Sequence, residues 1–361
     1  MMKSINDEFD VNDDKSPNLW RALFCKLDKL VRMQLIACPT SSAHLTESAL
    51  TPHFHLILRM SEHLSSGVAF LDFEHIRNIQ LARLVRATFS SNPQMKRVDT
   101  NDIIHGSLNC WEDVFHFSFR RDYIRDNHQK YRTQKLSASA GLSKVHKRWE
   151  SEPEKGYRDW FIEEAKSFGT SIVNNYTRIC NELLMKTTSG SVLPDDLLRI
   201  INDYSHCVVE TIKQAAERCG MQKEQSLRYA LDFLRSETIL DLPFNRIAAS
   251  MWAKYAFETS KKRKPKPPPS SFEEDVQVIS CLLPYCDAMF LDRECCRFLT
   301  SAEVTDVIDF EAVLFSKKNY EAFMTYLDSI ENEATESHIS VLDEVYGDSW
   351  REPYVTMYSN T

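Results

Sequence analysis

The sequence has little glycine and no excess of basic residues, and each absence argues against a class of protein. Only 8 of the 361 residues are glycine, which argues against a loop-rich β protein and against a glycine-rich nucleotide site. The formal net charge is −8, so the chain as a whole does not attract the phosphates of nucleic acid. A nucleic-acid substrate would therefore need a local basic patch or a metal ion.

Targeting and membrane signals are also missing. No run of about 18 apolar residues is present, so we expect no transmembrane helix and no membrane partner. The first 14 residues, MMKSINDEFDVNDD, lack the basic start and apolar core of a signal peptide. The ten cysteines follow no regular framework, although Cys295 and Cys296 are adjacent. We predict reduced thiols in a cytoplasmic protein. The sequence does not indicate the oligomeric state.

Most of the chain has the apolar spacing of amphipathic helices, with residues recurring at three- and four-residue intervals. This spacing predicts helices over 20–33, 56–64, 73–89, 111–131, 160–185, 195–217, 223–234 and 320–330. Two short apolar runs, Leu35–Cys38 and Ala288–Leu291, predict buried strands instead. A further apolar run covers Val307–Phe315. The sequence therefore predicts α/β character near both ends and a helical block between them.

Five segments follow from this pattern. They are a polar N-terminal segment (1–19), an α/β core made of 20–50 and 272–330, a helical insertion (51–260), a basic proline-rich linker (261–271) and an acidic, polar tail (331–361). The linker, KKRKPKPPPSS, is typical of a solvated connector, because its prolines exclude a helix interior. A nucleic-acid contact and a nuclear targeting signal are the alternative interpretations.

Four carboxylates adjoin the predicted strands or begin helices beside them: Glu47, Asp275, Asp287 and Asp292. Sites in open α/β sheets lie beyond the carboxyl ends of the strands, so these side chains converge if their strands are neighbours. Clustered carboxylates favour a hard cation, Mg²⁺ or Mn²⁺, which activates water and stabilises charge on a phosphodiester. The alternative is that they are ordinary helix caps.

Two segments resemble PIN-like domains. The pattern D-x11-DAMFLD at 275–292 resembles their C-terminal acidic motif, in which one Asp begins a helix and another ends the following strand. The segment ACPTSSAHLTES at 37–48 resembles their strand, Ser/Thr-rich turn and acidic helix, with Glu47 as the acid. The stretch VLFSKKNYEAFMTYL is similar to their closing strand and helix. The resemblance implies a small parallel, Rossmann-like sheet core interrupted by a large helical insertion.

The resemblance also implies a function, a divalent-metal-dependent nuclease that acts on RNA. Glu47, Asp275 and Asp292 would then hold one or two Mg²⁺ or Mn²⁺ ions, with Asp287 as a structural or outer contributor. PIN-like domains begin with a strand that ends in a further essential Asp. Here Asp7 and Asp10 are the nearest candidates, and neither follows a clear apolar strand. The competing hypothesis is a non-catalytic helical interaction protein that keeps a degenerate PIN-like core as a scaffold.

Histidines and cysteines form two further groups. His44, His53, His55 and His63 lie close in sequence but include no complete zinc motif, which favours solvated or hydrogen-bonded histidines over a zinc site. His44 lies three residues before Glu47, a spacing that would allow it to orient that carboxylate. The cysteines at 281, 286, 295 and 296 lack paired CxxC knuckles, which favours buried core thiols.

A basic, aromatic region covers 117–148 and begins with FSFRRDYIR. Basic side chains interleaved with aromatic rings suit single-stranded nucleic acid, although a solvated helix face is the competing interpretation. Under the nuclease hypothesis, this region and the basic run 261–266 would contact the RNA backbone.

Overall fold

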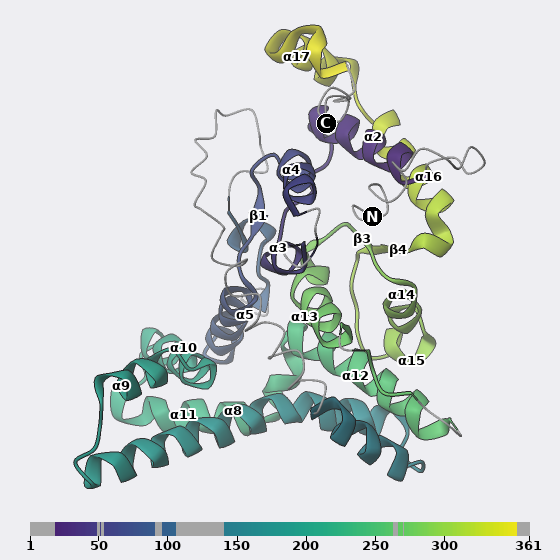
Figure 1. The fold of residues 1–361 in the computed structure, drawn as a ribbon. Helices are drawn as coiled ribbons and strands as arrows, with labels where there is room; N and C mark the ends of the chain where they lie inside the picture. The colour runs from purple at the N-terminus through teal and green to yellow at the C-terminus, as the bar shows by residue number, and fades with distance from the viewer. Residues whose placement is uncertain are drawn as a thin grey trace. The chain divides into compact units, whose positions relative to one another are not determined.

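The computed structural model describes most of the chain as helices joined by short connections (Figure 1). The described residues are 19–48, 51, 54–90, 96–105, 141–262, 266–269 and 271–351. They belong to two compact units. The terminal unit takes its described residues from 1–72, 104–133 and 315–361, and the central unit from 73–103 and 134–314. No helix in these ranges is long and apolar enough to cross a membrane.

The terminal unit is built around α2 (Leu19–Arg32). Apolar residues at three- and four-residue intervals, among them Trp20, Leu23 and Leu27, form the buried face of this helix. The Trp20 ring meets Tyr320 edge-on, and the Tyr320 hydroxyl donates to the Leu19 carbonyl at 2.6 Å. The remaining elements of this unit are α3 (Ser42–Ser48), α4 (Phe54–Ser65), β1 (Ala69–Phe70), β2 (Ile104–His105), η5 (Lys317–Asn319), α16 (Tyr320–Asn332), α17 (Glu336–Tyr346) and η6 (Gly347–Arg351).

The central unit contains the longest helix, α8 (Tyr157–Thr188), together with a preceding helical segment, 141–151. Its other elements are α5 (Phe73–Thr88), η2 (Thr100–Asp102), α9 (Pro194–Ile201), α10 (Tyr204–Arg218), α11 (Lys223–Arg235), η3 (Glu237–Asp241), α12 (Pro243–Lys261), α13 (Phe272–Leu282), η4 (Leu283–Tyr285), β3 (Ala288–Phe290), α14 (Arg293–Leu299) and α15 (Ala302–Thr305). Strand β4 (Val313–Phe315) follows α15 at the boundary of the two units.

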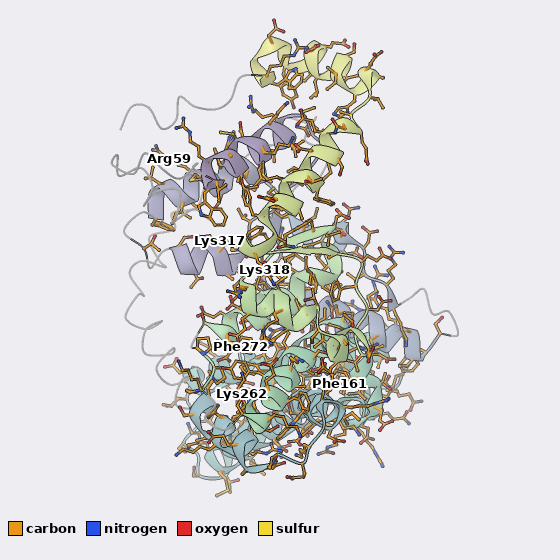
Figure 2. The ribbon with its side chains drawn as sticks, turned by 90° about the vertical axis from the view of Figure 1, so that its right-hand side faces the viewer. Arg59, Phe161, Lys262, Phe272, Lys317 and Lys318 are labelled. Atoms are coloured by element: carbon orange, nitrogen blue, oxygen red, sulfur yellow. The ribbon has the colours of Figure 1, made fainter. Side chains whose placement is uncertain are left out.

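An aromatic core holds α12, α13 and α14 together in the central unit. Phe272 at the start of α13 is fully buried, and its ring meets Trp252 of α12 edge-on at 4.9 Å. Phe298 of α14 lies 5.9 Å from both Phe272 and Tyr255. Figure 2 shows Phe272 among the side chains of this unit. Burial of large rings dominates core energetics, so these contacts fix the helices that carry Asp275 and Asp292.

The predicted PIN-like parallel sheet core is wrong for the described part of the chain. The strands there form two separate two-stranded sheets, β1 with β2 and β3 with β4, and β1 and β2 are antiparallel. The segments expected to share one sheet are also divided, since 20–50 belongs to the terminal unit and 272–314 to the central unit. The protein is therefore mostly helical, and the helical block is not an insertion in a sheet.

Leu35–Cys38 shows why the strand prediction failed. Gln34 adopts a positive φ of 56°, and the Leu35 N–H donates to the Leu30 carbonyl at 3.0 Å. This is the pattern of a helix end closed by a left-handed residue, so the backbone of the run finishes α2 rather than joining a ladder. An isolated parallel bridge joins Thr40 and Ala69 just after this run.

Many local predictions are confirmed. The helices predicted over 20–33, 73–89, 223–234 and 320–330 correspond to α2, α5, α11 and α16, and the strand predicted at 288–291 is β3. The helix predicted over 195–217 divides into α9 and α10, because the Asp203 side chain accepts hydrogen bonds from Ser205 and His206 N–H and starts a new helix. The helix predicted over 111–131 lies outside the described residues.

Candidate metal site at the start of helices α13 and α14

Asp275 lies in the first turn of α13. The Phe272 N–H donates to the Pro269 carbonyl at 3.0 Å, and the Asp275 N–H donates to the Ser271 carbonyl at 2.9 Å, so the chain enters the helix from the proline-rich segment. Carboxylates in a first turn are favoured by the partial positive charge of a helix N-terminus. Because Phe272 is anchored in the core, the half-buried Asp275 side chain is held on a fixed scaffold.

Asp292 is the N-cap of α14. Its backbone is extended, with φ −63° and ψ 164°, and its Oδ1 accepts a hydrogen bond from the Cys295 N–H at 2.6 Å. The side chain is exposed. Among the described lysine, arginine and histidine side chains, none forms an ion pair with Asp292. The capping role expected of such an Asp is therefore present, and it uses only one of the two carboxylate oxygens.

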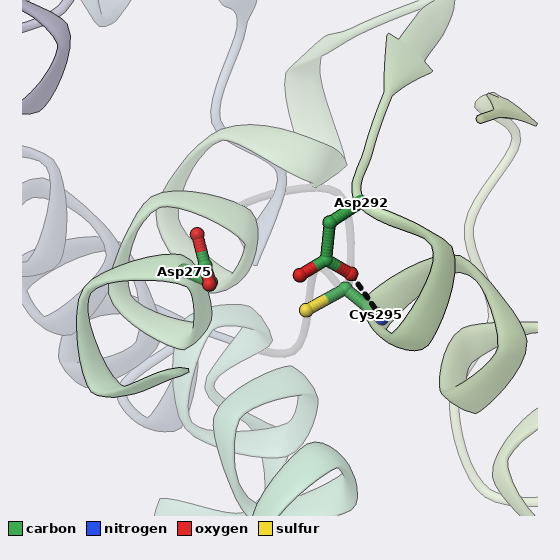
Figure 3. Close-up of side chains that lie close together, drawn as sticks. All are labelled: Asp275, Asp292 and Cys295. Atoms are coloured by element: carbon green, nitrogen blue, oxygen red, sulfur yellow. Dashed lines mark hydrogen bonds between the residues drawn. The ribbon is translucent and has the colours of Figure 1, made fainter. Parts of the chain in front are cut away.

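The structure brings Asp275 and Asp292 together, and it adds Cys295. One ligand atom from each residue, the two carboxylate oxygens and Sγ, lies within 4.8 Å of the other two (Figure 3). Cys295 is 1% exposed. Burial raises the pKa of its thiol, and the negative charges of Asp292 and Asp275 raise this pKa further, so the thiol is protonated at neutral pH. Among the described residues, this is the group of His, Cys, Asp and Glu side chains whose geometry suits a metal ion.

Of the other two predicted ligands, Asp287 lies outside this group, and the side chain of Glu47 is not described. Asp287 is exposed and precedes β3, where its carbonyl accepts the Val313 N–H at 2.8 Å. Glu47 belongs to α3 of the terminal unit, and its side chain is outside the part of the structure that is described. Its role as a third ligand stays a prediction. Asp7 and Asp10 also lie outside the described residues.

Cys295 was missed because the sequence grouped it with core thiols. It is indeed buried, as is Cys281, and all nine described cysteines are free. The available signal was its spacing from Asp292, since a residue three positions after an N-cap supplies the N–H that the cap binds. That position turns Cys295 back toward the cap, and hence toward Asp275.

The histidines do not form a metal site in the described part of the chain. His63 Nε2 bonds to the buried carboxylate of Asp28, and His44 Nδ1 lies 3.0 Å from Ser41 Oγ. His53 and the side chain of His55 lie outside what the structure describes. The prediction of hydrogen-bonded histidines is confirmed for His44 and His63. Whether His44 orients Glu47 stays a prediction.

The basic segments are described only in part. Residues 117–140 lie outside the described ranges, while Lys144 and Lys147 are exposed and Arg148 Nε pairs with Glu152 at 3.1 Å. In the linker, Lys261 donates to the Pro153 carbonyl at 2.6 Å and Lys262, labelled in Figure 2, pairs with Glu258 at 3.4 Å. An RNA-binding role for either segment stays a proposal.

Comparisons with known proteins add no relative. The chain matches no protein-family model, no curated protein and no solved structure at a significant level.

Proposed function

We propose that Asp275 and Asp292 bind a divalent metal ion, Mg²⁺ or Mn²⁺, and that the protein hydrolyses phosphodiester bonds of RNA. The observation that carries the proposal is the approach of the two carboxylates, whose ligand atoms lie with Cys295 Sγ within 4.8 Å of one another. Like charges so close repel each other, and a cation between them offsets the repulsion. Metal binding is supported by this geometry, whereas RNA as the substrate is supported only by the resemblance of 275–292 to the acidic motif of PIN-like domains.

The donor set fits a hard cation. Two carboxylate oxygens, completed by water and by phosphate oxygens of a substrate, are the ligands that Mg²⁺ prefers. Mg²⁺ and Mn²⁺ prefer hard oxygen ligands over a soft sulfur, so we assign the two carboxylates as the ligands and not Cys295. Zn²⁺ is the competing ion, because it binds a thiolate strongly and would displace the proton of Cys295.

Each residue has a definite role in this proposal. A bound ion supplies water activation and stabilises charge on the phosphate. Asp292 offers the oxygen that does not cap α14, and Asp275 offers a carboxylate from α13. The basic segments 117–148 and 261–266 are proposed as RNA contacts. We place the activity in the cytoplasm, because free thiols such as the nine described here are usual in a reducing compartment.

Metal binding and RNA cleavage test the proposal together. We expect Mn²⁺ to bind the native chain in isothermal titration calorimetry, and Asp275→Asn or Asp292→Asn to weaken the affinity by about tenfold or more. The same variants should lose Mn²⁺-dependent cleavage of a single-stranded RNA. Asp287→Asn is the matched control, because Asp287 is an exposed aspartate of the same stretch that lies outside the cluster. It should bind Mn²⁺ as the native chain does.

Asparagine is the informative substitution at Asp292. It caps a helix as well as aspartate does, so the variant keeps α14 and loses the charge and the second carboxylate oxygen. Circular dichroism should therefore be unchanged. Native Mn²⁺ affinity in both variants, or RNA cleavage that survives EDTA, would contradict the proposal. Tighter binding of Zn²⁺ that is lost in Cys295→Ser would assign the site to zinc instead. Glu47→Gln tests the third ligand separately.

A second candidate is the non-catalytic interaction protein. The observation that favours it is a set of exposed apolar side chains on α9, where Leu198 and Ile201 are 57% and 58% exposed. A native chain that binds no Mn²⁺ yet associates through α9 would support this candidate over the nuclease.

A further inference from the structure

An open groove lies along the C-terminal half of α8, in the central unit, and has a volume of about 800 Å³. α8 contributes side chains from Asn174 to Lys186 that recur at three- and four-residue intervals, which places them on one face of the helix. Arg199 of α9 and Arg235, the last residue of α11, also line the groove. Figure 1 shows α9 and α11 beside α8.

Cations outnumber carboxylates in this groove, although the chain as a whole has more acidic than basic residues. The lining cations are Arg178, Lys186, Arg199 and Arg235. Among the described residues that line the groove, Glu182 is the one carboxylate, and Asp196 pairs with Lys186 without lining it. Four cations against these two carboxylates leave an excess of two positive charges. A hollow lined by one sign of charge attracts the opposite sign, so the groove suits an anionic partner.

The arginines of the groove keep hydrogen-bond donors for such a partner. Arg178 and Arg199 both pair with Glu182, so this carboxylate holds one guanidinium from α8 beside one from α9. A guanidinium has five N–H donors, and these pairs leave several of them unused. Arg235 is exposed and forms no ion pair with any described side chain. Because a guanidinium binds two phosphate oxygens at once, phosphate is a well-matched ligand for these side chains.

The shape and lining of the groove favour a polymer over a small molecule or a protein segment. The side chains of Arg178 and Arg199 are 52% and 66% exposed, whereas a small-molecule pocket encloses most of its ligand. From Asn174 to Lys186 the helix rises about 18 Å, the axial length of roughly five nucleotides of one strand. Met185 is the one apolar residue among the described lining residues, and a protein segment would need more apolar anchors. Nucleic-acid interfaces are polar and positively charged.

We propose that this groove binds the phosphate backbone of a nucleic-acid strand without reading its base sequence. None of the described lining residues is aromatic, so the bases are not stacked there, and Asn174, Thr177 and Asn181 offer donors of the kind that bind phosphate and sugar oxygens. The choice of RNA as the strand rests on the proposed function. Figure 1 shows the end of α8 beside α9 well apart from α14, so a strand that reaches both the groove and the metal site is longer than the groove.

Fluorescence anisotropy of a labelled single-stranded RNA with the full chain, in EDTA, tests the groove without the metal. We expect the double variant Arg199→Ala, Arg235→Ala to weaken the affinity by about tenfold or more, because it removes two phosphate contacts. Arg228→Ala is the matched control, since Arg228 is an exposed arginine of α11 outside the groove. It should bind as the native chain does. Oligomers of uridine and of adenosine should bind the native chain about equally.

Salt and competitors identify the partner. If all four cations contact phosphates, the logarithm of the binding constant should fall with the logarithm of salt concentration at a slope of about −3, and the double variant should halve this slope. Native RNA affinity in the double variant, or no RNA binding by the native chain, would overturn the proposal. Tighter binding of polyglutamate that the double variant loses would overturn it in favour of an acidic protein segment.

The two proposals fail in different ways. Asp275→Asn should bind RNA in EDTA as the native chain does, because the metal site is not part of the groove. RNA binding that depends on Arg199 and Arg235, in a chain with no Mn²⁺-dependent cleavage, would support the groove and contradict the nuclease. Cleavage that depends on Asp275, with RNA binding unchanged in the double variant, would contradict the groove and leave the nuclease standing.

Discussion

The two oxygens of the Asp292 carboxylate lie in different surroundings. One oxygen accepts the Cys295 N–H at 2.6 Å and caps α14, and Figure 3 shows the other turned toward Asp275. The sequence predicts either a helix cap or a metal ligand for this residue. In the structure they are compatible, because a cap needs one oxygen and leaves the second free for an ion. Spacing around a predicted strand singled out Asp275, Asp287 and Asp292 together, and the resemblance to PIN-like domains ranked Asp275 and Asp292 as ligands. The position of Cys295 depends on how α14 begins.

Asp28 gives a prediction for the terminal unit. This carboxylate is 1% exposed and bonds to His63 of α4 and to Arg32 of α2, the latter at 2.7 Å. Burial acts to raise the pKa of Asp28, but the hydrogen bond from His63 and the charge of Arg32 outweigh it and lower the pKa below 3.8. We expect Asp28→Asn to lower the free energy of unfolding by about 3 kcal/mol at neutral pH, because it leaves Arg32 without its buried partner.

The pH dependence of this effect has a definite sign. A carboxyl group with a lower pKa in the folded state stabilises the fold above its unfolded pKa, near 3.8, and loses this contribution as pH falls through the folded value. The free energies of unfolding of the native chain and of Asp28→Asn, measured by chemical denaturation, should therefore differ most at neutral pH and become equal in acid. Asp328→Asn, which removes an exposed partner of Lys26, is the control and should cost less than about 1 kcal/mol. A difference that is constant with pH would contradict the account.

At the scale of elements, the contact between α8 and α11 depends on one glycine. A Cβ added at Gly169 would lie 1.8 Å from the Leu234 carbonyl oxygen, so the two helices would have to separate. Alanine normally stabilises a helix interior by about 1 kcal/mol relative to glycine, and here we expect the opposite sign. Gly169→Ala should lower the free energy of unfolding by about 3 kcal/mol.

Gly141→Ala is the control for this variant, because no atom lies within 4 Å of a Cβ added there. It should be neutral or slightly stabilising in the same urea titration. Equal stability of Gly169→Ala and the native chain would show that α8 and α11 do not approach each other as closely as described.

The helices were predictable because their signal is local. Apolar residues at three- and four-residue spacing predicted α2, α5 and α11, and the structure buries those faces. The prediction of a strand at Leu35–Cys38 is wrong because the Leu35 N–H bonds to α2 and closes that helix. The apolar character of these four residues does not indicate that hydrogen bond. α9 shows a second limit. Its pattern predicted a helix with one apolar side, and in the structure Leu197, Leu198 and Ile201 of that helix are exposed.

At the scale of the whole molecule, the predicted α/β fold class is wrong because fold class depends on which distant segments pair. The predicted sheet required 20–50 and 272–330 to share one core. Instead, 20–50 packs in the terminal unit, while β3 pairs with β4 only 25 residues later along the chain, counting from Ala288 to Val313. Short runs such as these carry too little information to specify partners across a 361-residue chain.

The two units lead to a prediction about cooperativity. Each has its own buried core, around α2 in the terminal unit and around α12 in the central unit. Units with separate cores unfold as separate cooperative steps, so calorimetry of the full chain should resolve two transitions. Asp28→Asn should lower only one transition, and Gly169→Ala only the other, each by about 5–10 °C. If both variants shifted one shared transition, the chain would unfold as a single cooperative body, and the division into units would carry no energetic meaning.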